Sequence, residues 1–131
     1  MNLFKKLGLY LKSFRMMVVT TEKEKATFTD LSPEETENLF KASQDQYTWL
    51  DVRTTMEFEQ GHIPGAKHIP VDQLEDRIQE VGDKNKSYVV YCQAGGRSAA
   101  ACQILHEKGF QHLWNAPGMG AWNGPTQSGQ R

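Results

Sequence analysis

The fold follows from one stretch of sequence, Tyr88-Val89-Val90-Tyr91-Cys92-Gln93-Ala94-Gly95-Gly96-Arg97-Ser98. Its first four residues have no polar face, so we expect a strand that is buried on both sides, as in a parallel sheet. The residues after it, from Ser98 to Leu105, are strong helix formers, and the two glycines allow a tight turn between strand and helix. Cys92 is therefore expected at the carboxyl end of a buried strand, facing the start of a helix.

The turn after Cys92 has the features of an anion site. The start of a helix has up to four unpaired N–H groups and roughly half a positive charge, and Arg97 adds a permanent cation. We expect these groups to lower the pKa of the thiol below the value of about 8.5 for a free cysteine. A cysteine that ends a core strand is more often an inert buried residue. Here the glycine pair and the arginine favour a reactive one, because an inert core needs neither.

The composition is that of one globular domain. The chain has 131 residues, of which 24% are charged, and a net charge of −1, so nothing global indicates nucleic acid as a partner. Two cysteines do not make a disulfide framework, which favours a reducing compartment, the cytoplasm. The sequence has no CxxC and its four histidines have no ligand spacing. We therefore expect no metal and no other cofactor.

Residues 1–21 form a basic segment with helical periodicity. Four of the 15 basic residues and none of the 16 acidic ones lie there, which leaves a net charge of −5 for the rest of the chain. The longest apolar run of the segment is five residues, too short for a membrane span or for the apolar part of a signal peptide. Such a helix either packs on protein, its own domain or a second copy, or lies on an anionic membrane surface. We favour protein packing, and a location peripheral to the membrane stays the alternative.

Strands and helices alternate along the rest of the chain. We expect strands at 28–31, 47–52, 67–69, 88–91 and 112–114, and helices at 33–42, 54–61, 72–81 and 98–108. Ser32 and Glu35 form the pattern of a capping box, and Thr54 with Glu57 frames the second helix. This alternation predicts an α/β sandwich with a mainly parallel five-stranded sheet flanked by helices. In such sheets the reactive groups gather beyond the carboxyl ends of the strands, where Cys92 would lie.

Three stretches together resemble the motifs of the single-domain rhodaneses, a family of rhodanese-like sulfurtransferases. They are Leu50-Asp51-Val52-Arg53 with Glu57 and Gly61-His62-Ile63-Pro64-Gly65-Ala66, then Cys92 to Ser98, and last Pro117-Gly118-Met119-Gly120-Ala121-Trp122. They occur in the order and at the spacing of that family, across residues 27–123. One departure is Pro117, where the family usually has the first of two glycines; it perturbs a loop that lines the pocket and removes no reactive group.

The resemblance also divides the chain and implies a fold. Residues 1–26 become a basic amphipathic extension, residues 27–123 the rhodanese-like domain, a three-layer sandwich, and residues 124–131 a polar tail. We expect that tail to be disordered.

The resemblance implies transfer of sulfane sulfur through a persulfide on Cys92. Thiosulfate or a persulfide would load the cysteine, and cyanide or a small thiol would take the sulfur away. A second interpretation is a sulfur carrier or docking module that delivers the persulfide to a partner protein. A third, a cysteine-dependent phosphatase, is disfavoured, because the phosphatase loop has five residues between its cysteine and arginine and this chain has four.

The expected site has three parts. Cys92 is the nucleophile, and the supporting residues are Asp51, Arg53 and Glu57. The residues expected to bind the substrate or its anion are Gln93, Ala94, Gly95, Gly96, Arg97 and Ser98. Arg53 and Glu57 are four residues apart, which predicts an ion pair between them. We expect Cys102, in the helix after the turn, to be a small buried hydrophobe, with a resolving thiol as the alternative.

Overall fold

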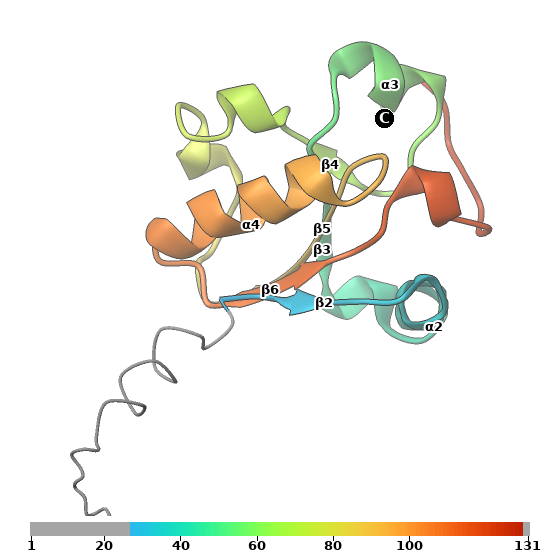
Figure 1. The fold of residues 1–131 in the computed structure, drawn as a ribbon, viewed down its shortest axis with the longest axis horizontal. Helices are drawn as coiled ribbons and strands as arrows, with labels where there is room; N and C mark the ends of the chain where they lie inside the picture. Colours follow the sequence, from blue (N-terminus) through green and yellow to red (C-terminus); the bar gives the residue numbers. More distant parts are fainter. Residues whose placement is uncertain (1–26, 130–131) are drawn as a thin grey trace, which may run out of the picture.

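The computed structural model describes residues 27–129, so the helix expected in residues 1–21 lies outside the described part of the chain. The described residues form a five-stranded sheet in which every pairing is parallel, in the order β2-β6-β5-β3-β4 (Figure 1). The strands are β2 (Thr29–Asp30), β3 (Thr48–Asp51), β4 (Lys67–His68), β5 (Ser87–Tyr91) and β6 (His112–Asn115). The α-helices are α2 (Pro33–Ser43), α3 (Thr55–Gln60) and α4 (Gly96–Glu107). The predicted α/β fold is confirmed.

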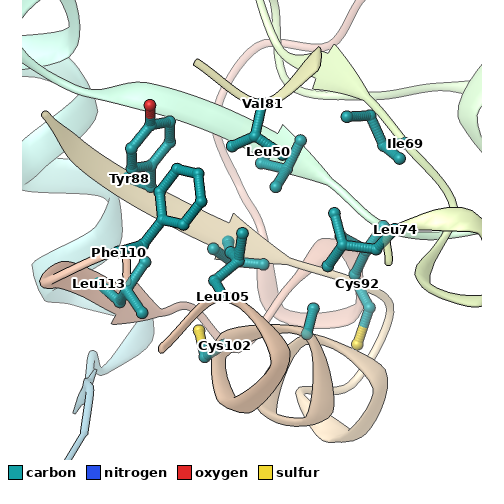
Figure 2. Packing of buried hydrophobic residues seen from close by; sticks show 13 residues of the cluster. Leu50, Ile69, Leu74, Val81, Tyr88, Cys92, Cys102, Leu105, Phe110 and Leu113 are labelled. Atoms are coloured by element: carbon teal, nitrogen blue, oxygen red, sulfur yellow. The ribbon is translucent and has the colours of Figure 1, made fainter. Parts of the chain in front are cut away.

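Each face of the sheet is covered by a separate core cluster. Successive side chains of a strand point to opposite faces, so Tyr88 and Val90 of β5 lie in one cluster and Val89 and Tyr91 in the other. The first cluster, part of which is drawn in Figure 2, packs against α4. In Figure 1, α4 lies on one side of the sheet and α2 on the other. The sheet and its two covers make the three layers that were predicted.

Aromatic rings fill much of the second cluster. Phe40 of α2 contacts Trp49 and Trp122 edge to face, with ring centroids 5.5 and 5.4 Å apart, a geometry that aromatic quadrupoles favour. Trp122 comes from the loop after β6, so the carboxyl-terminal motif is held on this face of the sheet. Trp49 is buried in this cluster, and Trp122 is partly buried against it.

Two capping boxes begin two of the helices, as the sequence predicts. The Ser32 hydroxyl accepts from the Glu35 N–H at 3.0 Å, and the Glu35 carboxylate accepts from the Ser32 N–H at 2.9 Å. Thr54 and Glu57 make the same reciprocal pair at the start of α3. Each box satisfies two N–H groups that a helix start leaves unpaired, which fixes where α2 and α3 begin.

The helix expected at 72–81 is wrong. The chain forms two 3-10 turns there, η2 (Val71–Gln73) and η3 (Ile78–Glu80). Arg77, just before η3, has φ −114° and ψ 26°, which is not helical. The apolar spacing nevertheless does what it predicts, since Leu74 and Val81 are both fully buried. Two tight turns bring these side chains into the core, and a continuous α-helix is not needed.

The disordered tail is also a wrong prediction for residues 124–129. Gln127 pairs with His62 through two backbone hydrogen bonds, each 2.9 Å long, and the Gly129 N–H donates to the Glu59 carbonyl at 2.9 Å. The Trp122 indole N–H donates to the Pro125 carbonyl at 2.8 Å. The segment is polar and exposed, but its main chain is tied to α3 and to the loop after it. Among residues 27–129, no helix is long and apolar enough to cross a membrane.

Candidate functional site

The parallel sheet brings the ends of three strands to one edge. Asp51, the last residue of β3, pairs in register with Tyr91, the last residue of β5. Asn115 ends β6 and pairs with Val90 of β5. Because parallel strands all run the same way, their carboxyl ends meet at this edge. Cys92, the first residue after β5, therefore lies between groups carried by both neighbouring strands.

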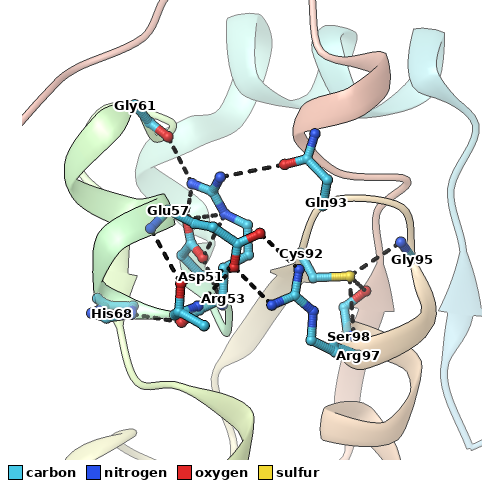
Figure 3. A network of polar contacts seen from close by, with 11 residues as sticks. Asp51, Arg53, Glu57, Gly61, His68, Cys92, Gln93, Gly95, Arg97 and Ser98 are labelled. Atoms are coloured by element: carbon cyan, nitrogen blue, oxygen red, sulfur yellow. Dashed lines mark hydrogen bonds and ion pairs between the residues drawn. The ribbon is translucent and has the colours of Figure 1, made fainter.

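The loop after β5 wraps around the sulfur of Cys92 (Figure 3). Gly95 N–H donates to Sγ at 3.1 Å and Ser98 N–H at 3.4 Å, and the Ser98 hydroxyl lies 3.4 Å from the same atom. Gly95 has φ +96°, a left-handed conformation that only glycine adopts readily. Gly95 and Ser98 both belong to the set of residues expected to bind the substrate or its anion.

These hydrogen bonds set the direction in which the pKa of the thiol shifts. Burial by itself raises the pKa of Cys92, whose side chain is only 1% exposed. The Ser98 hydroxyl and the amides of Ser98, Ala94 and Gly95 stabilise the thiolate and outweigh burial, so the pKa of Cys92 lies below its ordinary value. The expected direction of the shift agrees with the geometry, and neutral donors cause most of it.

Arg97 is held by Glu57 in a two-pronged ion pair. Its Nη1 donates to Oε1 at 2.8 Å and its Nη2 to Oε2 at 3.0 Å. The pair lowers the pKa of the Glu57 carboxyl to about 2. The same hydrogen bonds raise the pKa of Arg97, and the charge of Cys92 adds to the effect in the same direction. Figure 3 shows the pair beside the cysteine loop, joining the first turn of α4 to α3.

The ion pair predicted between Arg53 and Glu57 is wrong. Arg53 precedes the cap of α3, so the four-residue spacing along a helix does not apply to it. Its Nη2 donates instead to the Asp51 carboxylate at 2.8 Å and to the Gly61 carbonyl at 2.7 Å. Arg53 and Asp51 are 4% and 0% exposed, and a buried pair of this kind is a positioning element rather than a free binding group. The guanidinium also reaches the Gln93 side chain, with Nη1 3.5 Å from Oε1.

The third motif packs main chain against the cysteine loop. Met119 N–H donates to the Cys92 carbonyl at 3.0 Å, and Gly120 N–H to the Gln93 carbonyl at 2.9 Å. A Cβ on Gly118 would lie 2.1 Å from the Cys92 carbonyl oxygen, and its φ is +99°, so only glycine fits there. Pro117, the departure from the family pattern, precedes these contacts, and the donors come from the residues after it.

Two residues of the site were missed in the sequence. Asn115 Nδ2 donates to the Gly95 carbonyl at 3.3 Å and to Asp30 at 3.1 Å. The Tyr91 hydroxyl accepts a hydrogen bond from the Ile63 N–H at 3.0 Å and donates one to the Asp51 carboxylate. Burial raises the pKa of the Tyr91 hydroxyl. A signal was present for Asn115, a polar residue at the end of an apolar strand next to β5. For Tyr91, which reads as core, the sequence contained no such signal.

Cys102 and His62 are buried and have structural roles. Cys102 is a fully buried residue of α4, and burial raises its pKa to about 12, so its thiol stays protonated and fills the core. His62 is buried and its ring stacks on Phe58 with centroids 3.7 Å apart. Among the described residues, no group of three or more His, Cys, Asp or Glu side chains is arranged to hold a metal ion.

Comparison with known proteins finds relatives whose names refer to sulfur transfer or to a sulfur carrier. The thiosulfate sulfurtransferase PspE of Escherichia coli is 43% identical over 72 residues, which cover 54% of this chain and 69% of PspE. The putative sulfur carrier protein YrkF of Bacillus subtilis is 37% identical over 86 residues, which cover 65% of this chain. The chain thus spans only 46% of the length of YrkF.

Solved structures and a family model point to the same group of proteins. A structure described as a rhodanese with anions from E. coli has 39% identity and a TM-score of 0.59, covering 63% of this chain and 99% of its own. A rhodanese-like domain protein from Staphylococcus aureus has 30% identity and a TM-score of 0.69, covering 79% of this chain and 100% of its own. The model of the rhodanese-like domain matches residues 32–124. With its parallel sheet, its cysteine loop and this match, the chain belongs to the rhodanese-like domain family.

Proposed function

We propose that this protein is a sulfurtransferase that carries sulfane sulfur as a persulfide on Cys92. The observation that carries the proposal is the set of three donors around Sγ, the two amides and the hydroxyl that lie 3.1 to 3.4 Å from it. Such donors stabilise an anionic sulfur, and a persulfide is the same kind of anion extended by one atom. The relatives named for sulfur transfer support the assignment of this chemistry.

The proposed reaction has two steps at one sulfur. In the first, the Cys92 thiolate attacks the outer sulfur of thiosulfate, the S–S bond of the donor breaks, and sulfite leaves with the electron pair. In the second, cyanide or a thiolate attacks the outer sulfur of the persulfide, and the Cys92 thiolate is the leaving group. Charge is conserved in both steps, and neither needs an oxidant, a reductant or a metal.

The loop residues Gln93 to Ser98 would hold the sulfur and its donor. The lowered pKa of Cys92 increases the fraction of the nucleophile that is ionised at a given pH. Asp51 and Arg53 fix the floor of the site through their buried pair. The chain then supplies the reactive sulfur, the donors that stabilise it and the scaffold that aligns them.

Loading of the purified protein with thiosulfate tests this proposal. We expect Cys92 to gain the mass of one sulfur atom, as read by intact-protein and peptide mass spectrometry, and cyanide to remove it and yield thiocyanate. Cys92→Ala should abolish the gain, whereas Cys102→Ser should keep it, because Cys102 is buried away from solvent. Full loading of Cys92→Ala would contradict the mechanism.

A sulfur carrier is the second candidate function. It is favoured by the similarity to YrkF, a protein named as a putative sulfur carrier. Both functions use the same persulfide, so the rate of its discharge separates them. Rapid turnover with cyanide and small thiols favours the enzyme, and a persulfide that is stable to these and released to a protein thiol favours the carrier.

A further inference from the structure

Within the described part of the chain, the two cations beside the cysteine loop, Arg53 and Arg97, are already paired with carboxylates. The fork of Arg97 is filled by Glu57, at 2.8 and 3.0 Å. The guanidinium of Arg53 is filled by Asp51 and by the Gly61 carbonyl. A fork that holds a carboxylate with both prongs does not hold a second oxyanion in the same way.

The charges of these groups cancel in pairs. Asp51 and Arg53 sum to zero, and so do Glu57 and Arg97. When the thiolate of Cys92 is added, these five described residues carry one net negative charge before a donor arrives. A doubly charged donor meets more repulsion there than a singly charged one, by about 1 kcal/mol for each unit charge about 4 Å away in water.

We propose that Glu57 sets the choice of sulfur donor, because its pairing with Arg97 disfavours doubly charged oxyanion donors relative to donors of lower charge. The inference rests on the proposed persulfide chemistry of Cys92. It ranks singly charged or neutral sulfane compounds, such as the persulfides of organic or protein thiols, above doubly charged thiosulfate as donors of this protein. Glu57 acts here as a specificity-determining residue, because its ion pair with Arg97 keeps the guanidinium from binding the donor.

Two small donors separate charge from shape. Thiosulfate carries two negative charges, and methanethiosulfonate carries one because a methyl group replaces an oxygen. Attack of the Cys92 thiolate breaks the S–S bond in either donor and forms the same Cys92 persulfide. Sulfite leaves from the first donor and methanesulfinate from the second, each with the electron pair of the broken bond.

Glu57→Gln removes the charge and keeps the fold of the helix start. Glu57 is the third residue of the capping box of α3, where its side chain accepts from the Thr54 N–H at 3.0 Å. Glutamine serves at this position of a capping box as well as glutamate does. Glu59→Gln is the matched control: it removes one charge from the same helix two residues further on, and residues two apart do not share a helix face.

The test measures the second-order rate of Cys92 persulfide formation with each donor by mass spectrometry. In Glu57→Gln we expect the ratio of the thiosulfate rate to the methanethiosulfonate rate to rise roughly fivefold, the equivalent of one unit charge. In Glu59→Gln the ratio should stay at the wild-type value. An unchanged or lower ratio in Glu57→Gln overturns the inference while the proposed function stands.

A measurement on the unaltered protein needs no variant to fold. Salt screens repulsion between like charges, so raising the ionic strength should speed loading from thiosulfate more than loading from methanethiosulfonate. The reverse order overturns the inference. If neither donor adds sulfur to Cys92, the proposed function fails and the inference falls with it, which is a different outcome from loading at an unaltered ratio.

Discussion

At Cys92 the strongest stabilisers of the thiolate are neutral. Arg97 has its charge matched by Glu57, whereas the hydroxyl and the amide of Ser98 both reach Sγ. Ser98 is fully buried, so its hydroxyl is confined to this one environment. The side chain that does most to tune the nucleophile is thus a serine, although the sequence draws attention to the arginine.

Ser98→Ala should therefore raise the pKa of Cys92. The substitution removes a hydrogen bond that favours the charged thiolate, so a higher pH is needed to ionise the thiol. The pH at which loading by thiosulfate becomes fast should move upward together with the pKa. The pKa is measured from the ultraviolet absorbance of the thiolate against pH in a Cys102→Ser background. An unmoved titration would mean that the backbone amides suffice.

At the scale of the helix, α3 ties the cysteine loop to the first motif. Glu57 caps the start of α3 and also binds Arg97 of α4. Its carboxyl pKa falls from an ordinary 4.5 to about 2, chiefly through the Arg97 hydrogen bonds. A carboxyl whose pKa is lower in the folded state stabilises that state above its unfolded pKa, and this contribution disappears as the pH falls through the folded pKa.

The free energy of unfolding should therefore decrease between pH 4.5 and about 2 partly because Glu57 takes up a proton. In Glu57→Gln this part of the decrease should be missing, so the two proteins converge in stability towards pH 2. Urea unfolding at a series of pH values measures the difference, with Glu59→Gln as the charge control. Parallel curves for the wild type and Glu57→Gln over this range would show that the ion pair adds nothing to stability.

Prediction from sequence succeeded where a local pattern has one solution. The apolar run of β5 has no polar face, which predicts a buried strand. The capping-box patterns locate the first residues of α2 and α3. It failed where a local rule was applied outside its element: Arg53 lies before the cap of α3, so it does not pair with Glu57. Backbone contacts leave no mark in the side-chain pattern, which is why the hydrogen bonds of Gln127 could not be foreseen.

At the scale of the whole molecule, the last described residues bind the main chain of α3 and of His62 through backbone hydrogen bonds. Removing residues 124–131 deletes the two backbone bonds between Gln127 and His62 and the bond from Gly129 to Glu59. It also deletes the bond from the Trp122 indole to the Pro125 carbonyl. We expect the free energy of unfolding to drop by roughly 3–4 kcal/mol, at about 1 kcal/mol for each hydrogen bond. Denaturant unfolding tests this, with Gln127→Ala as the control that keeps both backbone bonds. Equal stability of the truncated and full chains would contradict this expectation.

The pairing of the first described strand with the last has a consequence for synthesis. Among the strands of residues 27–129, β2 pairs only with β6, Thr29 with Trp114 and Asp30 with Asn115. A ribosome that adds about 5–20 residues per second must make the whole stretch between these partners, which takes seconds, before the sheet can be completed. Until then β6, the neighbour of both β2 and β5, does not exist, and two strand edges stay open. The strand edges of the nascent chain are thus exposed to wrong pairing during this interval, and the site at the carboxyl ends of the strands is completed only after β6 has joined the sheet.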